Sequence, residues 1–211
     1  MPIEQSTSPA RTPFTQSLIL QRLRRDTSEA HAMLEVALPL QDVQLTRASY
    51  HALLLRFWGF YAPLEERLLG GPGHAHLPFD YRERAKAPKL QDDLYDMGHS
   101  PEMLLRAPQC DDLPSISTLP QILGCLYVIE GATLGGQIIA RQLRVNLGLT
   151  PDVGARFFNG YGADTGSRWK ETTACLTTMA ATLNQDDVIV AGANATFQSL
   201  GRWVANSCSV Q

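Results

Sequence analysis

The stretch YVIEGATLGGQIIARQL, residues 127–143, has the apolar density of a buried helix but contains three glycines, Gly131, Gly135 and Gly136. Inside a helix each glycine costs about 1 kcal/mol relative to alanine. Two explanations account for this cost. The missing side chains either let two helices pack closely or leave room for a ligand, and this stretch alone leaves both explanations open.

The chain on either side of this stretch also has helical periodicity. The predicted helix extends over residues 119–147 and ends at Gly148, in C-cap position, with Pro151 just beyond. Apolar residues at three- and four-residue steps predict further helices at 17–38, 45–69, 166–183 and 186–206. Residues 74–120 are broken by prolines, with short helical segments expected at 81–86 and 89–97. No run alternates apolar and polar residues between hairpin turns, so no sheet is expected.

These patterns predict an all-α fold. We expect a single-domain multi-helix bundle of six to eight helices over residues 17–211. The polar segment 1–16, rich in proline, serine and threonine, is expected to be a flexible leader without the features of a signal peptide.

The composition argues against several classes of partner. The formal charge of −3 and the pI of about 5.9 give no basic face for nucleic acid, so none is expected as a partner. The cysteines show no CxxC pair or zinc-like spacing, which favours a reducing, cytoplasmic location; they are Cys110, Cys125, Cys175 and Cys208. A basic cluster, Arg82, Arg84, Lys86 and Lys89, is expected to form a solvated helix face rather than a docking surface.

The segment 119–140 is long enough to cross a bilayer and contains glycines at four-residue spacing. Gln121, Glu130 and Gln137 lie within it, and a carboxylate near a bilayer centre costs about 3 kcal/mol. Membrane insertion is therefore not expected.

The sequence contains none of the common nucleophile, phosphate-loop or metalloprotease motifs, and no histidine has a glutamate three residues before it. His31 shares the apolar face of its predicted helix with Leu23, Thr27 and Leu34. A histidine in this position is most often a hydrogen-bonded core residue, but it can also bind a haem iron from one side.

Gly131 and Gly135 lie one helical turn apart, and Tyr127 lies one turn earlier on the same face. Without side chains there, backbone atoms can approach a flat ligand. Together with His31 on another helix, these glycines predict a planar cofactor held between two helices. Glu130 points about 100° away from Gly131, so a structural salt bridge is expected for it.

Four segments resemble the haem oxygenase family. LRRDTSEAHAMLE, residues 23–35, resembles the proximal-helix motif, with His31 in the position of the iron ligand, and YVIEGATLGGQ, residues 127–137, resembles the distal helix. YHALLLRFWGFYAPLE, residues 50–65, and GYGADTGSRW, residues 160–169, are similar to the bacterial branch often encoded beside bacteriophytochromes. The resemblance implies a haem-oxygenase-like bundle with haem between the proximal and distal helices.

The resemblance also implies an activity. Haem b would be both cofactor and substrate, and dioxygen with reducing equivalents would convert it to biliverdin, carbon monoxide and ferrous iron. An external electron donor would be needed, such as a ferredoxin, a flavoprotein reductase or ascorbate, and a bacteriophytochrome could accept the biliverdin. The alternative is a haem-binding carrier or sensor on the same fold without turnover. A thiaminase-like enzyme would need a catalytic cysteine beside carboxylates, which no motif here supplies.

Carried over to this chain, the resemblance makes His31 the metal ligand and Gly131 and Gly135 the distal residues beside bound oxygen. It places Arg24 and Tyr127 as propionate partners, and Arg168 as a further cation. The expected cofactor-binding set is Arg24, Thr27, His31, Tyr127, Gly131, Gly135, Gly136 and Arg168. Gly136 belongs to the motif, but its direction suggests packing or bending. Ala132 stands where animal-type members have an aspartate, so other polar groups and water must deliver protons.

Overall fold

The computed structural model describes residues 17–38 and 45–206. The described residues form α-helices and short 3₁₀ helices, without a strand, so the all-α prediction is confirmed. The expected leader lies outside the described residues. The elements are α1 (Leu18–Asp26), α2 (Ser28–Ala37), α3 (Arg47–Gly70), η1 (Pro72–His76), η2 (Tyr81–Arg84), α4 (Ala87–Asp96), α5 (Pro101–Leu105), α6 (Leu119–Leu147), α7 (Arg156–Asn159), η3 (Gly162–Asp164), α8 (Thr165–Leu183) and α9 (Asp186–Asn206).

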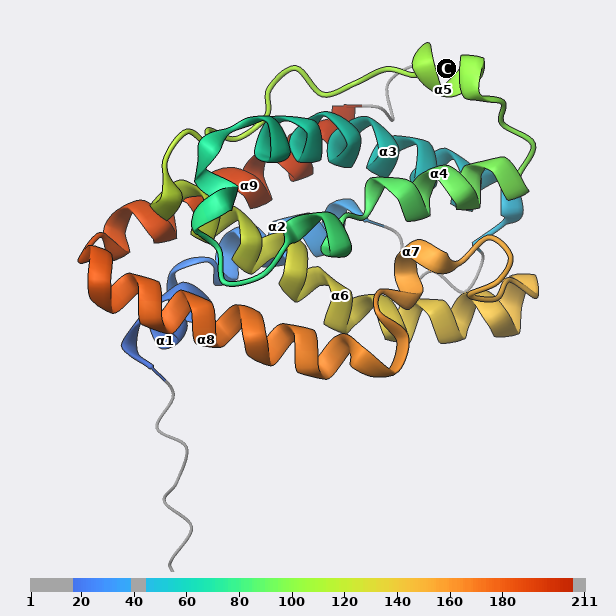
Figure 1. Ribbon diagram of the computed structural model, residues 1–211. Helices are drawn as coiled ribbons and strands as arrows, with labels where there is room; N and C mark the ends of the chain where they lie inside the picture. The colour runs from blue at the N-terminus through green and yellow to red at the C-terminus, as the bar shows by residue number, and fades with distance from the viewer. Residues whose placement is uncertain (1–16, 39–44, 207–211) are drawn as a thin grey trace, which may run out of the picture.

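Helix α6 is the central element of the bundle (Figure 1). It starts at a capping box in which Thr118 and Gln121 satisfy each other's backbone N–H groups. It ends at Gly148 in the left-handed conformation, with φ 66°, as the sequence predicts. By length and composition α6 could cross a membrane, but 56% of its most apolar window is buried in the protein. Its apolar character therefore matches that of a core helix.

Close packing through glycine joins α6 to α9. A Cβ atom on Gly124 would overlap the carbonyl oxygen of Ile189, and one on Gly192 would lie 3.0 Å from the carbonyl oxygen of Gln121. The backbones of α6 and α9 therefore approach too closely for a side chain at Gly124, and leave room for one at Gly192 only if a neighbour shifts. The packing explanation for glycine thus holds in the first half of α6, before residue 131.

The first predicted helix is divided in two, which corrects the expectation of one helix over residues 17–38. Thr27, with φ −109° and ψ 1°, separates α1 from α2. The Thr27 hydroxyl donates to the carbonyl oxygen of Leu23 and the Ser28 hydroxyl to that of Arg25, each at 2.8 Å. The Thr27 backbone N–H also donates to the carbonyl oxygen of Leu23, at 3.0 Å, so backbone and hydroxyl share this acceptor, an arrangement that often bends helices.

The proline-rich region between α3 and α6 contains η2 and α4, close to the predicted segments 81–86 and 89–97. The short helices α5 and α7 were not predicted. Together with the division at Thr27 they bring the described part of the chain to nine α-helices, more than the six to eight expected. A helix of four or five residues has too few turns to show a periodic apolar face, so sequence periodicity misses it.

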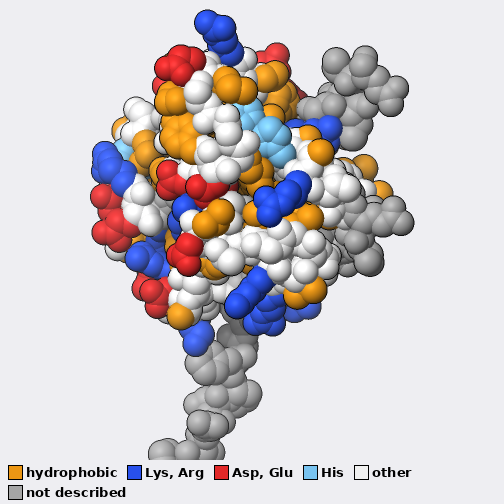
Figure 2. All heavy atoms as spheres, turned by 90° about the vertical axis from the view of Figure 1, so that its right-hand side faces the viewer, with side chains coloured by type: hydrophobic (Ala, Val, Ile, Leu, Met, Phe, Trp, Pro, Cys, Tyr) orange, Lys and Arg blue, Asp and Glu red, His pale blue; other side chains and the backbone are white. Residues whose placement is uncertain are grey.

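On the face shown in Figure 2, acidic, basic and apolar side chains of the described residues are interspersed. The sequence places 18 basic and 21 acidic residues in the whole chain. This face therefore presents no continuous field of one sign.

Candidate functional site

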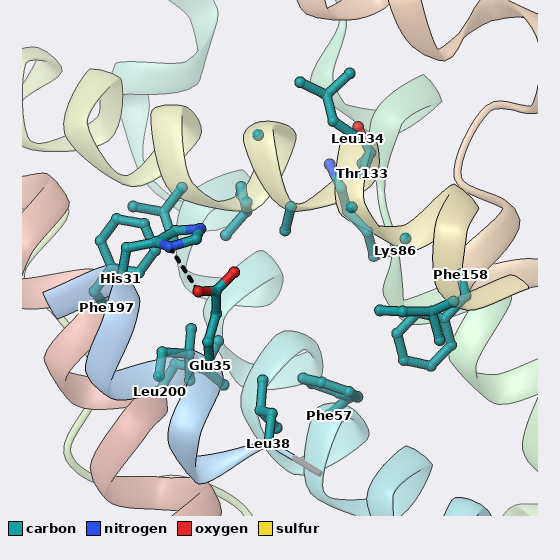
Figure 3. A pocket seen from close by; sticks show the side chains of 18 of the residues that line it. His31, Glu35, Leu38, Phe57, Lys86, Thr133, Leu134, Phe158, Phe197 and Leu200 are labelled. Carbon is teal, nitrogen blue, oxygen red and sulfur yellow. Dashed lines mark ion pairs between the residues drawn. The ribbon is translucent and has the colours of Figure 1, made fainter. Parts of the chain in front are cut away.

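A cavity of about 910 Å³ lies between α2 and α6, and α3, α7, α8, α9 and the segment before α4 also contribute to its walls (Figure 3). Its volume is in the range of pockets that enclose cofactors. The walls are mainly apolar and aromatic, with side chains that include Leu38, Phe57, Phe158, Phe197 and Leu200. Such walls suit a large, flat, mostly apolar ligand.

His31 lies at one wall of this cavity, on α2. Its side chain is 53% exposed and faces the cavity, where the sequence led us to expect a position within the core. The ring packs edge to face against Phe197, with centroids 5.5 Å apart, and its Nδ1 lies 3.7 Å from Oε2 of Glu35 (Figure 3). Because Nδ1 faces the carboxylate, Nε2 is the nitrogen available to a ligand.

The glycine-containing turn of α6 forms the wall across from α2. A Cβ on Gly135 would meet no atom within 4 Å, and one on Gly131 would only touch the Trp169 ring at 3.5 Å. A Cβ on Gly136 would lie 2.8 Å from the carbonyl oxygen of Phe158. Gly131 and Gly135 therefore leave space at the cavity, and Gly136 permits close packing of α6 on α7, although it too borders the cavity.

Helix α7 supplies two aromatic side chains to the cavity wall, Phe157 and Phe158. The buried carboxylate of Asp93 holds the start of this helix by accepting from the backbone N–H groups of Arg156 and Phe157, each at 2.9 Å. Burial raises the pKa of Asp93, and these hydrogen bonds oppose the shift. A polar residue of α4 thus positions an apolar wall of the site.

Three further predicted residues, Arg24, Thr27 and Tyr127, meet beside the cavity. Tyr127 lines it, and burial raises the pKa of its phenol while contributions from Thr27 and Arg24 act in the opposite direction. Arg24 is exposed and Thr27 is buried, and neither is among the residues that line the cavity. The structure therefore brings these three residues together, with Tyr127 alone in contact with the cavity.

The structure does not bring Arg168 into this group. Its guanidinium lies 3.6 Å from Glu83 Oε2 and over the Tyr161 ring, 5.8 Å from the centroid, and Arg168 does not line the cavity. Through its ion pair with Glu83, Arg168 joins α8 to η2.

Two members of the basic cluster are buried, which corrects the expectation of a solvated face. The side chain of Arg84 is 0% exposed and that of Lys86 is 5% exposed, and both form ion pairs with Glu130, which is 1% exposed. The structural salt bridge expected for Glu130 is thus confirmed. Lys86 also lines the cavity and was missed as a site residue, because charge spacing in a short, irregular segment gives no sign of burial.

A second buried carboxylate, Glu65, lies next to this ion pair. It accepts hydrogen bonds from the Tyr81 hydroxyl at 2.8 Å and from the backbone N–H groups of Lys86 and Ala87. Burial and the neighbouring carboxylates raise the pKa values of Tyr81 and Tyr161 well above the usual range. Both phenols therefore stay protonated and act as hydrogen-bond donors to the carboxylates.

The described residues contain no group of three or more histidine, cysteine or acidic side chains arranged to hold a metal ion. A metal at this site would have to arrive within a cofactor that supplies most of its ligands, as a haem does. One imidazole facing an apolar cavity, with a wall of α6 that lacks side chains opposite, fits that requirement. The fold and the site are thus those of a helical protein whose cavity suits a planar, iron-containing cofactor such as haem.

Comparisons with known proteins agree with this class. A family model described as "Heme oxygenase" matches residues 17–206, so the chain belongs to the heme oxygenase family and is an oxidoreductase that degrades haem. A search of curated protein sequences found no match to the chain.

Two solved structures have a similar fold. The heme oxygenase of Neisseria meningitidis, in structures with NO and CO bound, is 17% identical, with a TM-score of 0.73 over 92% of this chain and 93% of that one. The heme oxygenase of Leptospira interrogans is 20% identical, with a TM-score of 0.68 over 89% of this chain and 98% of that one. The expected haem-oxygenase-like fold is thereby confirmed.

Proposed function

We propose that this chain binds haem b in the cavity between α2 and α6 and converts it to biliverdin, carbon monoxide and ferrous iron. The observation that carries the proposal is the placement of His31 and of the turn with Gly131 and Gly135 on different walls of one apolar cavity. Bound haem supplies the iron at which dioxygen is reduced. The reaction also needs electrons from an external donor, for which a ferredoxin, a flavoprotein reductase and ascorbate are candidates.

In this proposal His31 would hold the haem iron through Nε2, because its Nδ1 faces Glu35. A carboxylate beside the other ring nitrogen orients a ligating imidazole and increases its basicity. The apolar walls exclude water from the reacting side, which strengthens electrostatic interactions there. Gly131 and Gly135 leave the space that oxygen needs next to α6.

The cationic end of the site is proposed from the grouping of Arg24, Thr27 and Tyr127. Tyr127 can donate a hydrogen bond to a propionate, and Arg24 can pair with its charge. Gly136 is assigned to the packing of α6 on α7. Arg168 is proposed as a further cation for the haem propionates, and to reach them it would have to leave its ion pair with Glu83. We also propose a cytoplasmic location, a domain that begins at residue 17, and a bacteriophytochrome as one acceptor of the product.

The test is a titration of the protein with haem, followed by reduction in the presence of dioxygen and analysis of the products. We expect a Soret band typical of histidine ligation, then its replacement by biliverdin absorption with release of carbon monoxide. A haem complex that survives reduction and aeration unchanged would point to a carrier or sensor instead. Failure to bind haem would contradict the proposal altogether.

A further inference from the structure

The carboxylate of Glu130 lies behind the cavity wall, on α6, directly before Gly131. It accepts from the amine of Lys86, from the Tyr161 hydroxyl at 2.9 and 3.0 Å, and from the Arg84 guanidinium at 3.4 Å. The donors come from η2, from the segment just before α4 and from the segment before α8, so one carboxylate ties α6 to three other parts of the fold.

Lys86 connects this buried group with the cavity. Its side chain lines the cavity and is drawn among the lining residues in Figure 3. The amine is also hydrogen-bonded to the Tyr161 hydroxyl, at 3.1 Å. The ion pair between Lys86 and Glu130 is therefore adjacent to the wall that faces α2.

On the cavity side the glycines in the turn of α6 between Glu130 and Gly136 make few contacts, and just after the turn the Gln137 amide donates to the Gly162 carbonyl at 2.6 Å and to the Thr165 hydroxyl at 2.9 Å. Gly135 has open space where a Cβ would be, and Gly131 has a single ring at contact distance. Glycine also widens the range of backbone conformations available to this turn. The turn is held at one end by the ion pairs of Glu130 and at the other by the packing of Gly136 against Phe158.

Stability alone is a poor explanation for this arrangement. Burying a carboxylate and two cations costs much of the energy that their attraction returns, and apolar replacements of similar volume are often as stable or more so. A buried ion pair does, however, restrict the arrangement of its partners, because separating them would leave a buried charge without a partner. Here the restriction applies to the position of the α6 turn that borders the cavity.

We propose that Glu130 is a positioning residue for the cavity wall across from His31. Through its ion pair with Lys86, Glu130 fixes the turn 131–136 of α6 against the bound haem. The proposal rests on the proposed function, since it takes haem as the ligand. Glu130 acts through the position of Gly131 and Gly135 and through Lys86, not by touching the reacting atoms.

The experiment compares Lys86→Met with the pair variant Glu130→Gln/Lys86→Met. Methionine keeps an apolar chain at the cavity and removes the amine, and the pair variant removes one anion and one cation together, so no new net charge is buried. Glu65→Gln is the matched control, because Glu65 is a carboxylate of similar burial, 3% exposed, whose described hydrogen bonds all go to residues outside α6. For each protein we would measure the Kd for haem, the spectrum of the ferric complex and the free energy of unfolding.

We expect the pair variant to bind haem more weakly than wild type, by about 10-fold or more, at the low end of the effect of removing a group that supports a metal ligand. Its unfolding free energy should stay close to that of wild type, whereas Glu65→Gln should lose stability with a smaller change in haem affinity. A pair variant that binds haem as wild type does, with an unchanged spectrum, would overturn the proposal. Wild type that fails to bind haem would instead overturn the proposed function.

Discussion

His31 and Glu35 face each other across one turn of α2, with Nδ1 of the imidazole 3.7 Å from Oε2 of the carboxylate. The two residues lie at positions i and i+4, so helical geometry alone brings them together. Because Nδ1 faces the carboxylate, Nε2 is the ring nitrogen on the side away from Glu35. The same turn thus carries the candidate iron ligand and a carboxylate beside its other ring nitrogen.

The first prediction concerns the axial ligand. His31→Ala should abolish the spectrum of histidine-ligated haem and most of the turnover, because no other histidine lines the cavity among the described residues. Soret titration and product analysis check this result. His76→Ala is the control, since His76 is exposed and lies outside the cavity lining, and it should behave as wild type. Retention of both properties in His31→Ala would mean that another residue is the ligand.

The second prediction uses the open space beside Gly135. Gly135→Leu should fold with little loss of stability, because no atom lies within 4 Å of the added Cβ and glycine is a poor helix former. The larger side chain would occupy the haem side of α6 and should weaken haem binding about tenfold or more, equivalent to about 1.4 kcal/mol. Thermal unfolding and haem titration separate the two effects. A variant that unfolds while its folded fraction binds haem normally would favour a packing role for Gly135.

The third prediction concerns Gly124, which, unlike Gly135, has no space for a side chain. Gly124→Ala should destabilise the protein by about 1–3 kcal/mol, the usual cost of overpacking, because the added methyl group would overlap the backbone of α9 at Ile189. Denaturant unfolding measures the change. Gly70→Ala provides the control: Gly70 ends α3 with no atom within 4 Å of a Cβ, so its stability should not fall. A neutral Gly124→Ala would show that α6 and α9 can move apart at no cost.

The long helices were predictable from the sequence because their apolar faces repeat over several turns. The bounds of α6 and α9 match the predicted ranges 119–147 and 186–206. The break at Thr27 was not predicted, because the apolar positions continue across it and the side-chain hydrogen bonds of Thr27 and Ser28 to Leu23 and Arg25 are local. Periodicity reports which face is buried and says little about local bends.

The site was predictable in part. His31 and the glycines of α6 carry a recognisable pattern within their own helices, and the structure brings them to one cavity. Lys86 and Glu65 carry none, since their roles depend on the path of the chain between α3 and α4. Three glycines of α6 look alike in sequence, yet Gly135 faces open space and Gly136 faces the backbone of Phe158. That difference depends on tertiary packing.

The fourth prediction concerns thiol reactivity. Burial raises the pKa of Cys125 to about 12, and Cys125 is 0% exposed, so the reactive thiolate is scarce and inaccessible at neutral pH. Alkylation of the native protein with iodoacetamide, followed by mass spectrometry, should leave Cys125 unmodified. Denaturation before alkylation should expose it fully. Rapid labelling of Cys125 in the native state would mean that α6 opens locally in solution.

The fifth prediction addresses the residue after the first distal glycine. Ala132 is exposed at the cavity wall, so Ala132→Asp should fold normally and add a carboxylate next to the bound haem. A negative charge raises the pKa of nearby acidic groups, so the pH-dependent transition of the ferric haem spectrum should move to higher pH. Ala132→Asn, which has a similar shape without the charge, should leave the midpoint closer to that of wild type. If the transition has the same midpoint pH in Ala132→Asp and Ala132→Asn, residue 132 is electrostatically remote from the haem. The groups that deliver protons would then have to lie on other walls of the cavity.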